Sequence, residues 1–308
     1  MQLAAVDIGS NAIRLQVVRS IEEEQMVSFK KTEFMRFPLR LGHDVFTKNE
    51  ISIKTAKKFI DLMRAFKLLI DLYEVQDHIA VATSAMREAR NGPEIIKKVK
   101  EVSGLDIQII DGELEAEILS KAIVPVIGFG TYLHIDVGGG STELNIYHDK
   151  VKLASKSFNI GSVRKLTTES RNDIFLAMKE WMNKTNIGAT AQIKAVGTGG
   201  NINKLYTLAN VKGDSTISIY EIEAIRAYIS SYNLEQRVKI LKMNPDRADV
   251  IMPASEIYLR AMKACGAKEM LVPGVGLKDG LIYNLYEKAV DTSLSQIKFL
   301  DQMYMEEH

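Results

Sequence analysis

The sequence predicts an α/β protein of two domains, and three observations support this prediction. Its 308 residues are more than one ordinary hydrophobic core accommodates. Short stretches rich in Val, Ile and Ala alternate with longer stretches whose apolar residues recur at helical spacing. An Asp-x-Gly turn between two apolar stretches occurs twice, which indicates duplication of a whole domain. Because Val124-Pro125 follows a predicted helix, we predict domains at residues 1–124 and 125–308.

The first domain is predicted to contain four short strands and a long helix. The helix covers residues 51–73 and has Phe59, Met63 and Phe66 on one face. Asn91-Gly92-Pro93 predicts a second helix start, with Asn91 as the cap and the proline in the first turn. The predicted strands are residues 4–8, 13–18, 79–82 and 107–110.

The second domain is predicted to repeat this scheme of strands followed by helices. Its predicted strands are residues 132–137, 142–147, 152–158 and 193–196. Its predicted helices are residues 174–182, 219–230, 248–264 and 278–286.

Composition narrows the classes of function. Apolar residues make up 46% and charged residues 26% of the chain, as in soluble globular proteins. The net charge is only +1, so the sequence predicts no nucleic-acid partner. No apolar run approaches the roughly 20 residues that cross a bilayer. Asp7 and Arg14 interrupt the N-terminal stretch, so we predict neither a signal peptide nor a membrane partner.

Cys265 is the one cysteine, which excludes an intrachain disulfide. The expected setting is therefore the reducing cytoplasm. The thiol stands in Ala-Met-Lys-Ala-Cys-Gly, a pattern typical of the end of an amphipathic helix, and is predicted to be packed and not catalytic. A homodimer is left open, since dimers are the commonest oligomers but no segment identifies an interface.

The two Asp-x-Gly turns match residue by residue. Ala5-Val6-Asp7-Ile8-Gly9-Ser10 aligns with His134-Ile135-Asp136-Val137-Gly138-Gly139, and Leu15 and Val17 then align with Leu144 and Ile146. Small residues in such turns allow successive backbone N–H groups to form a concave anion site. Neither turn is a P-loop, because the Gly-Lys-Ser/Thr ending is missing. Neither is a dinucleotide fingerprint, because both lead into strands.

The residue types around these turns suit phosphate and magnesium. The hydroxyls of Ser10, Ser141 and Thr142 can donate to phosphate oxygens. A carboxylate beside bound phosphate is repulsive unless a cation lies between them, and Mg²⁺ takes one or two carboxylates together with phosphate oxygens. The alternative is a pair of tight hairpin turns with solvated aspartates. The three consecutive glycines at 138–140 argue against it, because glycine loses the most entropy on folding.

A third glycine-rich segment, residues 196–201, follows a strand and opens a helix. Its glycines include Gly197 and Gly199, and a helix N-terminus attracts anions. A plain strand-to-helix turn explains the segment equally well.

Two arginines could also reach phosphate: Arg87 follows a strand end with small hydroxyl residues, and Arg14 lies four residues past Ser10. Ordinary surface arginines would give the same pattern.

Several carboxylates gather at the predicted helix start of residues 109–117. The simplest explanation is that they complement the helix dipole. A functional explanation requires one of them to accept a proton from an attacking water. Glu113 and Glu117 share a face by their four-residue spacing, whereas Glu115 points elsewhere, so these acids cannot all serve one site.

With these segments in place, the sequence resembles the exopolyphosphatase / guanosine pentaphosphate phosphohydrolase (Ppx/GppA phosphatase) family over nearly its whole length, in its short two-domain form. The most specific shared motif is Asp-x-Gly-Gly-Gly-Ser-Thr-Glu at residues 136–143. The other shared motifs, in family order, are residues 7–11 with Arg14-Leu15, 82–89, 112–116, 197–200, 247–251 and 276–280.

The resemblance implies an actin-like fold of two ribonuclease-H-like domains, with the active site in the cleft between them. It implies that Glu115 orients or deprotonates the attacking water, and that Asp136 and Glu143 hold Mg²⁺ or another divalent cation. The residues expected to bind phosphate are Ser10, Asn11, Arg14, Arg87, Gly138, Gly139, Gly140, Ser141, Thr142, Gly197 and Gly199. The expected substrate is inorganic polyphosphate or guanosine pentaphosphate.

One position departs from the family pattern of Gly-x-Glu-Glu-Ala, since Leu114 replaces the first glutamate while Glu115 retains the second. The number of bound cations therefore stays open. Two rival functions are also left open. Actin-like folds include ATPases and sugar kinases with the same paired phosphate turns, and Leu114 is compatible with a nonenzymatic sensor of polyphosphate or guanosine tetraphosphate.

Overall fold

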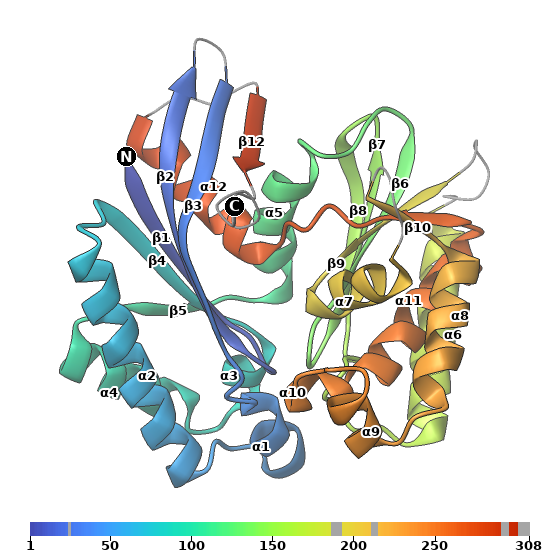
Figure 1. Cartoon of the computed structure of the whole chain (residues 1–308), viewed down its shortest axis with the longest axis horizontal. Coiled ribbons are helices and arrows are strands. Elements are labelled where there is room, and N and C mark those ends of the chain that lie inside the picture. Colours follow the sequence, from blue (N-terminus) through green and yellow to red (C-terminus); the bar gives the residue numbers. More distant parts are fainter. Residues whose placement is uncertain (24–25, 186–192, 211–214, 291–295, 301–308) are drawn as a thin grey trace. The chain divides into compact units, whose positions relative to one another are not determined.

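The chain divides into two compact units, each built on a six-stranded sheet (Figure 1). The structure is a computed structural model that describes residues 1–23, 26–185, 193–210, 215–290 and 296–300. Unit 1 comprises Met1–Pro125 and Val275–His308, and unit 2 comprises Val126–Gly274. The sequence placed the first boundary near residue 124, next to this division. It assigned residues 275–308 to the second domain, whereas helix α12 (Leu277–Val290) packs in unit 1.

The sheet of unit 1 has the order β12-β3-β2-β1-β4-β5. The central strand β1 pairs antiparallel with β2 and parallel with β4, and β4 pairs parallel with β5. The strands are β1 (Gln2–Ile8), β2 (Ile13–Glu23), β3 (Met26–Phe37), β4 (Asp77–Ala82), β5 (Ile107–Ile109) and β12 (Gln296–Leu300).

Strand β1 is buried on both faces because helices cover both sides of its sheet. Ala4, Val6 and Ile8 enter a core with helices α2 (Ile53–Leu72) and α4 (Gly92–Ser103). Leu3 and Ala5, which point the other way, enter a core with α5 (Gly112–Ile123) and α12. Helix α12 lies more than 260 residues after β1 in the sequence, so this core joins two segments that are far apart along the chain.

The sheet of unit 2 has the order β10-β11-β9-β6-β7-β8. Its run β8-β7-β6-β9-β11 repeats β3-β2-β1-β4-β5 of unit 1, with the same antiparallel and parallel pairings. The duplication inferred from two turns therefore extends to whole sheets, and each unit has a ribonuclease-H-like order of strands. The strands are β6 (Thr131–Val137), β7 (Thr142–His148), β8 (Val151–Phe158), β9 (Lys194–Thr198), β10 (Thr216–Ser218) and β11 (Glu269–Leu271).

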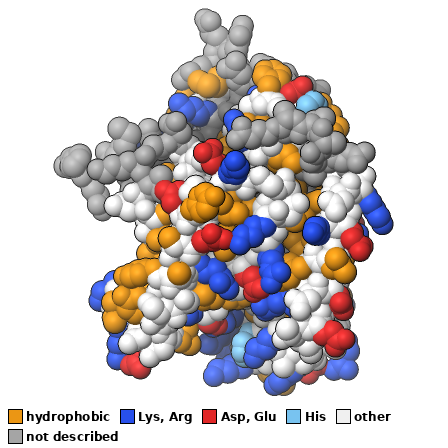
Figure 2. All heavy atoms as spheres, turned by 90° about the vertical axis from the view of Figure 1, so that its right-hand side faces the viewer, with side chains coloured by type: hydrophobic (Ala, Val, Ile, Leu, Met, Phe, Trp, Pro, Cys, Tyr) orange, Lys and Arg blue, Asp and Glu red, His pale blue; other side chains and the backbone are white. Residues whose placement is uncertain are grey.

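The described residues of unit 2 also form six helices, and four of these supply most of its core. Residues of α6, α7, α8 and α11 pack against Leu133, Ile135 and Val137 of β6. On the face that includes α6 and α8, acidic and basic side chains are interspersed with apolar ones (Figure 2). The helices are α6 (Thr168–Lys184), α7 (Gly200–Ala209), α8 (Ile219–Ser230), α9 (Leu234–Lys239), α10 (Pro245–Ala248) and α11 (Ile251–Cys265).

Cys265 confirms the prediction that it packs at a helix end. It is the last residue of α11 and is buried in the core of unit 2. Burial raises the pKa of its thiol to about 11.

Among the helices in the described ranges, none combines the length and the apolarity that a membrane crossing requires.

Each predicted strand overlaps a strand of the structure, but some elements of unit 1 were not predicted. They are β3, β12 and the short helix α1 (Leu41–Lys48), whereas the short helix α3 (Ser84–Glu88) follows β4 where the small hydroxyl residues indicated a helix start. Asn91 does precede α4, as predicted, but its side chain does not cap that helix. Its amide instead exchanges two hydrogen bonds with the backbone of Ile51, of 2.9 and 2.8 Å, and so joins two segments 40 residues apart.

Candidate active site

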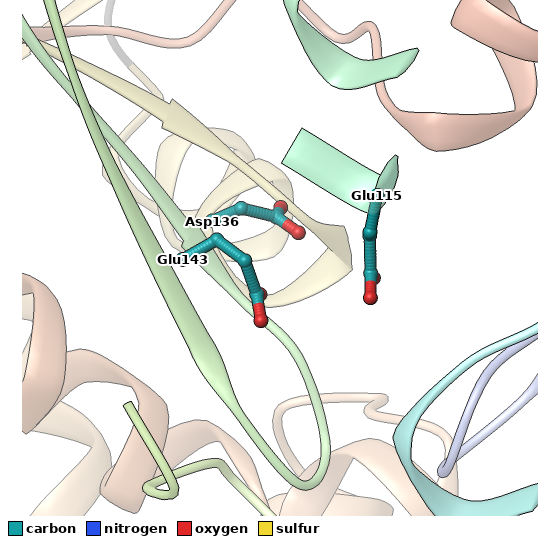
Figure 3. Close-up of side chains that lie close together, drawn as sticks. All are labelled: Glu115, Asp136 and Glu143. Atoms are coloured by element: carbon teal, nitrogen blue, oxygen red, sulfur yellow. The ribbon is translucent and has the colours of Figure 1, made fainter. Parts of the chain in front are cut away.

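Two carboxylates lie side by side where β6 and β7 meet the second glycine turn. Asp136 and Glu143 are direct partners in the antiparallel register, so their side chains leave the same face of the sheet. A carboxylate oxygen of each lies within 4.8 Å of one from the other (Figure 3). Carboxylate oxygens are the ligands that Mg²⁺, Mn²⁺ and Ca²⁺ prefer, so the pair suits a hard divalent cation.

Hydroxyl groups orient both carboxylates. Ser141 and Ser157 donate to the same oxygen of Glu143, over 2.6 and 2.9 Å. Thr198, at the end of the neighbouring strand β9, donates to Oδ1 of Asp136. Side chains that bond to a ligating group fix its direction. Residues of unit 2 therefore orient both carboxylates without a bound cation.

The segment after β8 holds the glycine turn by donating hydrogen bonds to the carbonyl groups of the turn. The N–H of Ser162 donates to the carbonyl of Gly138 over 3.0 Å. The N–H groups of Val163 and Arg164 both donate to the carbonyl of Gly139, over 2.8 and 3.0 Å. The peptide groups of the turn are thereby fixed with their carbonyls toward residues 162–164.

The N–H groups of this turn remain available for a ligand. In the described parts of the chain, the N–H groups of Gly139, Gly140 and Ser141 donate to no backbone carbonyl. Gly161 packs directly on the turn, because a Cβ there would lie 2.7 Å from the nitrogen of Gly140. Successive N–H groups in a fixed turn, beside carboxylates that suit a cation, have the arrangement of an anion-binding concavity and suit a phosphate group.

The first turn, in unit 1, has the same construction with a different pair of charges. Asp7 and Arg14 are register partners across β1 and β2, and their side chains form an ion pair of 2.7 Å. The carbonyls of Ser10 and Asn11 accept the N–H groups of Gly42 and Arg40, so the segment after β3 holds this turn as the segment after β8 holds the other.

The predicted phosphate ligands of unit 1 fall into two groups. Ser10, Asn11 and Arg14 belong to the first turn, and the Ser10 hydroxyl lies 2.9 Å from that of Ser84 at the start of α3. Arg87, also on α3, donates to the carbonyl of Ile110 over 2.6 Å. This bond ties Arg87 to the residue just before the segment that opens helix α5.

Helix α5 carries Glu115 in its first turn (Figure 3). The Asp111 side chain caps the helix by accepting the N–H of Leu114 over 2.8 Å. Glu115 shares its side of α5 with Ala116 and Leu119, whereas Glu113 is exposed. The structure therefore separates Glu115 from the other acids, as its spacing predicted. Leu114, which replaces the family's first glutamate, is 41% exposed.

The two glycines of the third glycine-rich segment have different roles, one in packing and one beside Asp136. Gly197 lies inside β9, where a Cβ would collide with the sulfur of Met270, so packing alone requires glycine there. Gly199 has φ +101, which other residues rarely adopt, and a Cβ there would lie 3.5 Å from Oδ1 of Asp136. The Gly199 backbone therefore borders the carboxylate of Asp136.

Sequence reasoning missed three residues of this arrangement. Thr198 and Ser157 bond to the two carboxylates, and Gly161 supports the turn. Thr198 stood inside a motif already singled out, between two glycines, so its hydroxyl could have been noted. Ser157 is one of two serines in a polar strand and gave no signal.

A family model and several relatives match this chain. The model of the Ppx/GppA phosphatase family matches residues 17–289. The "Guanosine-5'-triphosphate,3'-diphosphate pyrophosphatase" of Vibrio cholerae is 25% identical over 300 residues, covering 92% of this chain and 59% of that protein. The "Exopolyphosphatase 1" of Mycobacterium tuberculosis is 25% identical over 317 residues, covering 94% of this chain and 90% of that protein. This chain thus spans about three fifths of the pyrophosphatase.

Solved structures share the fold. A Ppx/GppA family member from Aquifex aeolicus superposes with a TM-score of 0.72 at 25% identity, covering 94% of this chain and 98% of that one. An exopolyphosphatase from Cytophaga hutchinsonii superposes with a TM-score of 0.79 at 20% identity, covering 96% and 99%. Both likenesses confirm the predicted actin-like fold of two ribonuclease-H-like domains. The family model, which matches residues 17–289, establishes that the chain belongs to the Ppx/GppA phosphatase family.

Proposed function

We propose that this protein hydrolyses the terminal phosphoanhydride bond of inorganic polyphosphate with the help of magnesium. The observation that carries the proposal is the Asp136–Glu143 pair beside the turn that presents the N–H groups of residues 139–141. A cation ligand set and a phosphate cradle on one hairpin suit a substrate that carries both phosphate and its counterion.

Asp136 and Glu143 would hold the cation. Their oxygens are hard ligands, and hydroxyl donors already fix their directions, so the residues present fit Mg²⁺. When bound, the cation would offset the negative charge of the transferred phosphoryl group. The N–H groups of the turn would donate to phosphate oxygens, whereas the hydroxyls of Ser141 and Thr142, which the sequence suggested for this task, already donate to Glu143 and to the carbonyl of Ile160.

Glu115 would position the attacking water and accept its proton. The first turn of a helix is a rigid place for such a group, and the Asp111 cap fixes where that turn begins. The residues that we propose to grip the phosphate chain from unit 1 are Ser10, Asn11, Arg14 and Arg87.

Polyphosphate is the first substrate to test, and guanosine pentaphosphate is the second. The relative named an exopolyphosphatase is covered over 90% of its length, whereas the relative named a pyrophosphatase of a guanosine nucleotide is covered over 59%. A cradle of backbone N–H groups recognises phosphate and not the base, so it serves either substrate. The choice between them therefore depends on parts of the substrate beyond the terminal phosphate.

Two other functions compete with this proposal. An ATPase or sugar kinase would use the same paired turns, and ATP turnover would reveal it. A nonenzymatic sensor of polyphosphate or guanosine tetraphosphate would bind without releasing phosphate. Glu115 in its separate position on α5 favours a hydrolase over both.

The test is orthophosphate release from long-chain polyphosphate with magnesium, with guanosine pentaphosphate and ATP in parallel. We expect release by the wild type and a roughly 10²–10⁴-fold lower kcat in Glu115→Gln, the usual effect of removing a general base. Glu113→Gln is the matched control, because Glu113 lies two residues away on the exposed side of α5. It should keep the wild-type rate.

Phosphate release that is equal in wild type and Glu115→Gln would refute the role of Glu115. Binding of polyphosphate by the folded wild type without release from any of the three substrates would instead favour the sensor. Turnover confined to ATP would favour the ATPase or kinase.

A further inference from the structure

A chain of four hydrogen bonds runs through unit 2 and ends on Asp136. Ser155 donates to Oδ1 of Asn145 over 2.6 Å, and the amide nitrogen of Asn145 lies 3.1 Å from Nδ1 of His134. Nε2 of His134 lies 2.8 Å from the hydroxyl of Thr198, which in turn donates to Asp136. The chain thus crosses the strands β8, β7, β6 and β9 in their order in the sheet.

The chemistry of the groups fixes the direction of every bond. The hydroxyl proton of Thr198 is used on the carboxylate, so Thr198 accepts from His134, whose proton must therefore be on Nε2. Nδ1 then lacks a proton and accepts from the amide nitrogen of Asn145. The carbonyl of that amide accepts from Ser155. All four donors point toward Asp136, and such an aligned chain polarises each successive bond.

The strand pattern shows that these polar groups are a departure from ordinary packing. On β6, Leu133, Ile135 and Val137 enter the core, whereas His134 and Asp136 project from the opposite face. His134 and Asn145 are nonetheless completely buried, at 0% exposure each. Burying two polar side chains costs stability unless their hydrogen bonds are satisfied, and an apolar pair would avoid that cost.

We propose that His134 is a positioning residue which, through Thr198, fixes the carboxylate of Asp136 in the direction needed to bind a divalent cation. This inference rests on the proposed cation site of Asp136 and Glu143 and adds how that site is preorganised. Loss of such indirect partners typically weakens metal binding by about 10–100-fold.

Titration of the full-length protein with Mn²⁺ in a calorimeter, without substrate, tests the proposal. We expect Thr198→Val, which removes the hydroxyl but keeps the shape, to raise the dissociation constant by about 10–100-fold. Thr198→Ser retains the hydroxyl and should bind within roughly threefold of wild type. His134→Leu should resemble Thr198→Val, whereas His134→Gln, whose amide nitrogen can replace Nε2–H, should recover much of the affinity.

Met178→Ala is the matched control for a purely structural effect. Met178 is 1% exposed in the core that Leu133, Ile135 and Val137 enter, on the other face of the sheet from His134, so its truncation should lower the melting temperature and leave Mn²⁺ affinity unchanged. Nitrogen NMR of the metal-free protein provides a second measurement that needs no variant. It should show the His134 ring with its proton on Nε2.

The outcomes separate this inference from the proposed function. A wild type that binds no Mn²⁺ would overturn both the cation site and the role of His134. A wild type that binds Mn²⁺ with affinity equal to that of folded Thr198→Val and His134→Leu would overturn the positioning role alone. A ring proton on Nδ1 would also overturn it, because the chain of donors would then not lead to Asp136.

Discussion

Arg14 occupies in the first hairpin the position that Glu143 occupies in the second. Each is the register partner of the aspartate that opens its turn, Asp7 in unit 1 and Asp136 in unit 2. The Arg14 guanidinium lies 2.7 Å from the Asp7 carboxylate and neutralises it, whereas Glu143 adds a second negative charge beside Asp136. The duplicated turns have therefore diverged: the second pairs two carboxylates, which suits a cation, whereas the first pairs a carboxylate with a guanidinium.

This divergence predicts that the cation affinity depends on one turn. Asp136→Asn or Glu143→Gln removes one of two closely spaced carboxylates and should weaken Mn²⁺ binding by more than about tenfold, as the loss of a direct ligand requires. Asp7→Asn is the matched control, because its carboxylate is already paired with Arg14. Calorimetric titration of the three variants should separate them, and equal losses in all three would show that both turns bind the cation.

The strand pattern and the turns were predictable because each has a local cause. Alternating apolar residues specify strands such as β1, and the repeated Asp-x-Gly specified both hairpins. Strand β3 was missed because it carries Lys30, Lys31 and Glu33 among its apolar residues and is half exposed. The cap predicted for Asn91 was displaced by a tertiary contact with Ile51, which local sequence does not encode.

The long-range parts of the molecule lay beyond sequence reasoning. Asp279, on α12, accepts a hydrogen bond from Gln16 of β2 across 263 positions of the chain, and no periodicity could pair them. That contact helps to hold α12 in unit 1, although the sequence assigned it to the second domain. Thr198, which bonds to Asp136 across 62 positions of the chain, was missed for the same reason. Ser157 is the register partner of Glu143 on the next strand, β8, and was missed because nothing in that polar strand distinguishes it.

The thiol of Cys265 should be unreactive in the native protein. Its pKa is raised from 9.0 to about 11 by burial, so at pH 8 only roughly a thousandth of it is thiolate, the form that reacts. Labelling with a thiol reagent at pH 8 should be slow in buffer and fast in urea. Because the folded pKa lies above the unfolded one, the thiol contributes stability that is full below pH 9 and lost as the pH rises toward 11. Cys265→Ala should lack that pH dependence, and rapid labelling of the native protein would contradict the buried position.

Gly280 should be required for the packing of α12 against α5. A Cβ at this position would lie 2.9 Å from the carbonyl carbon of Ile118, three residues after Glu115. Gly280→Ala should therefore lower the free energy of unfolding by about 1–3 kcal/mol, as overpacking does. Gly276→Ala is the control, since nothing lies within 4 Å of a Cβ there. Urea denaturation of both variants would check this. Equal free energies of unfolding for Gly280→Ala and Gly276→Ala would mean that close packing of α12 against α5 contributes no stability.

The support that Gly161 gives to the second turn should be visible in substrate affinity. An alanine Cβ would lie 2.7 Å from the nitrogen of Gly140, so the turn must shift and its N–H groups must lose their common direction. Gly161→Ala should raise KM for polyphosphate by roughly tenfold, a loss of about 1.4 kcal/mol of binding, provided the proposed hydrolysis is observed.

Gly266→Ala is the matched control for this experiment. Gly266 also lies in unit 2, at the left-handed C-cap of α11 with φ +76, and nothing lies within 4 Å of a Cβ there. Alanine at this position should destabilise the protein by about 1 kcal/mol through backbone strain and leave KM unchanged. Phosphate-release kinetics should then show a raised KM for Gly161→Ala alone, and thermal denaturation should show that Gly266→Ala is destabilised at an unchanged KM. A KM for Gly161→Ala equal to that of wild type would mean that the glycine turn does not hold the substrate.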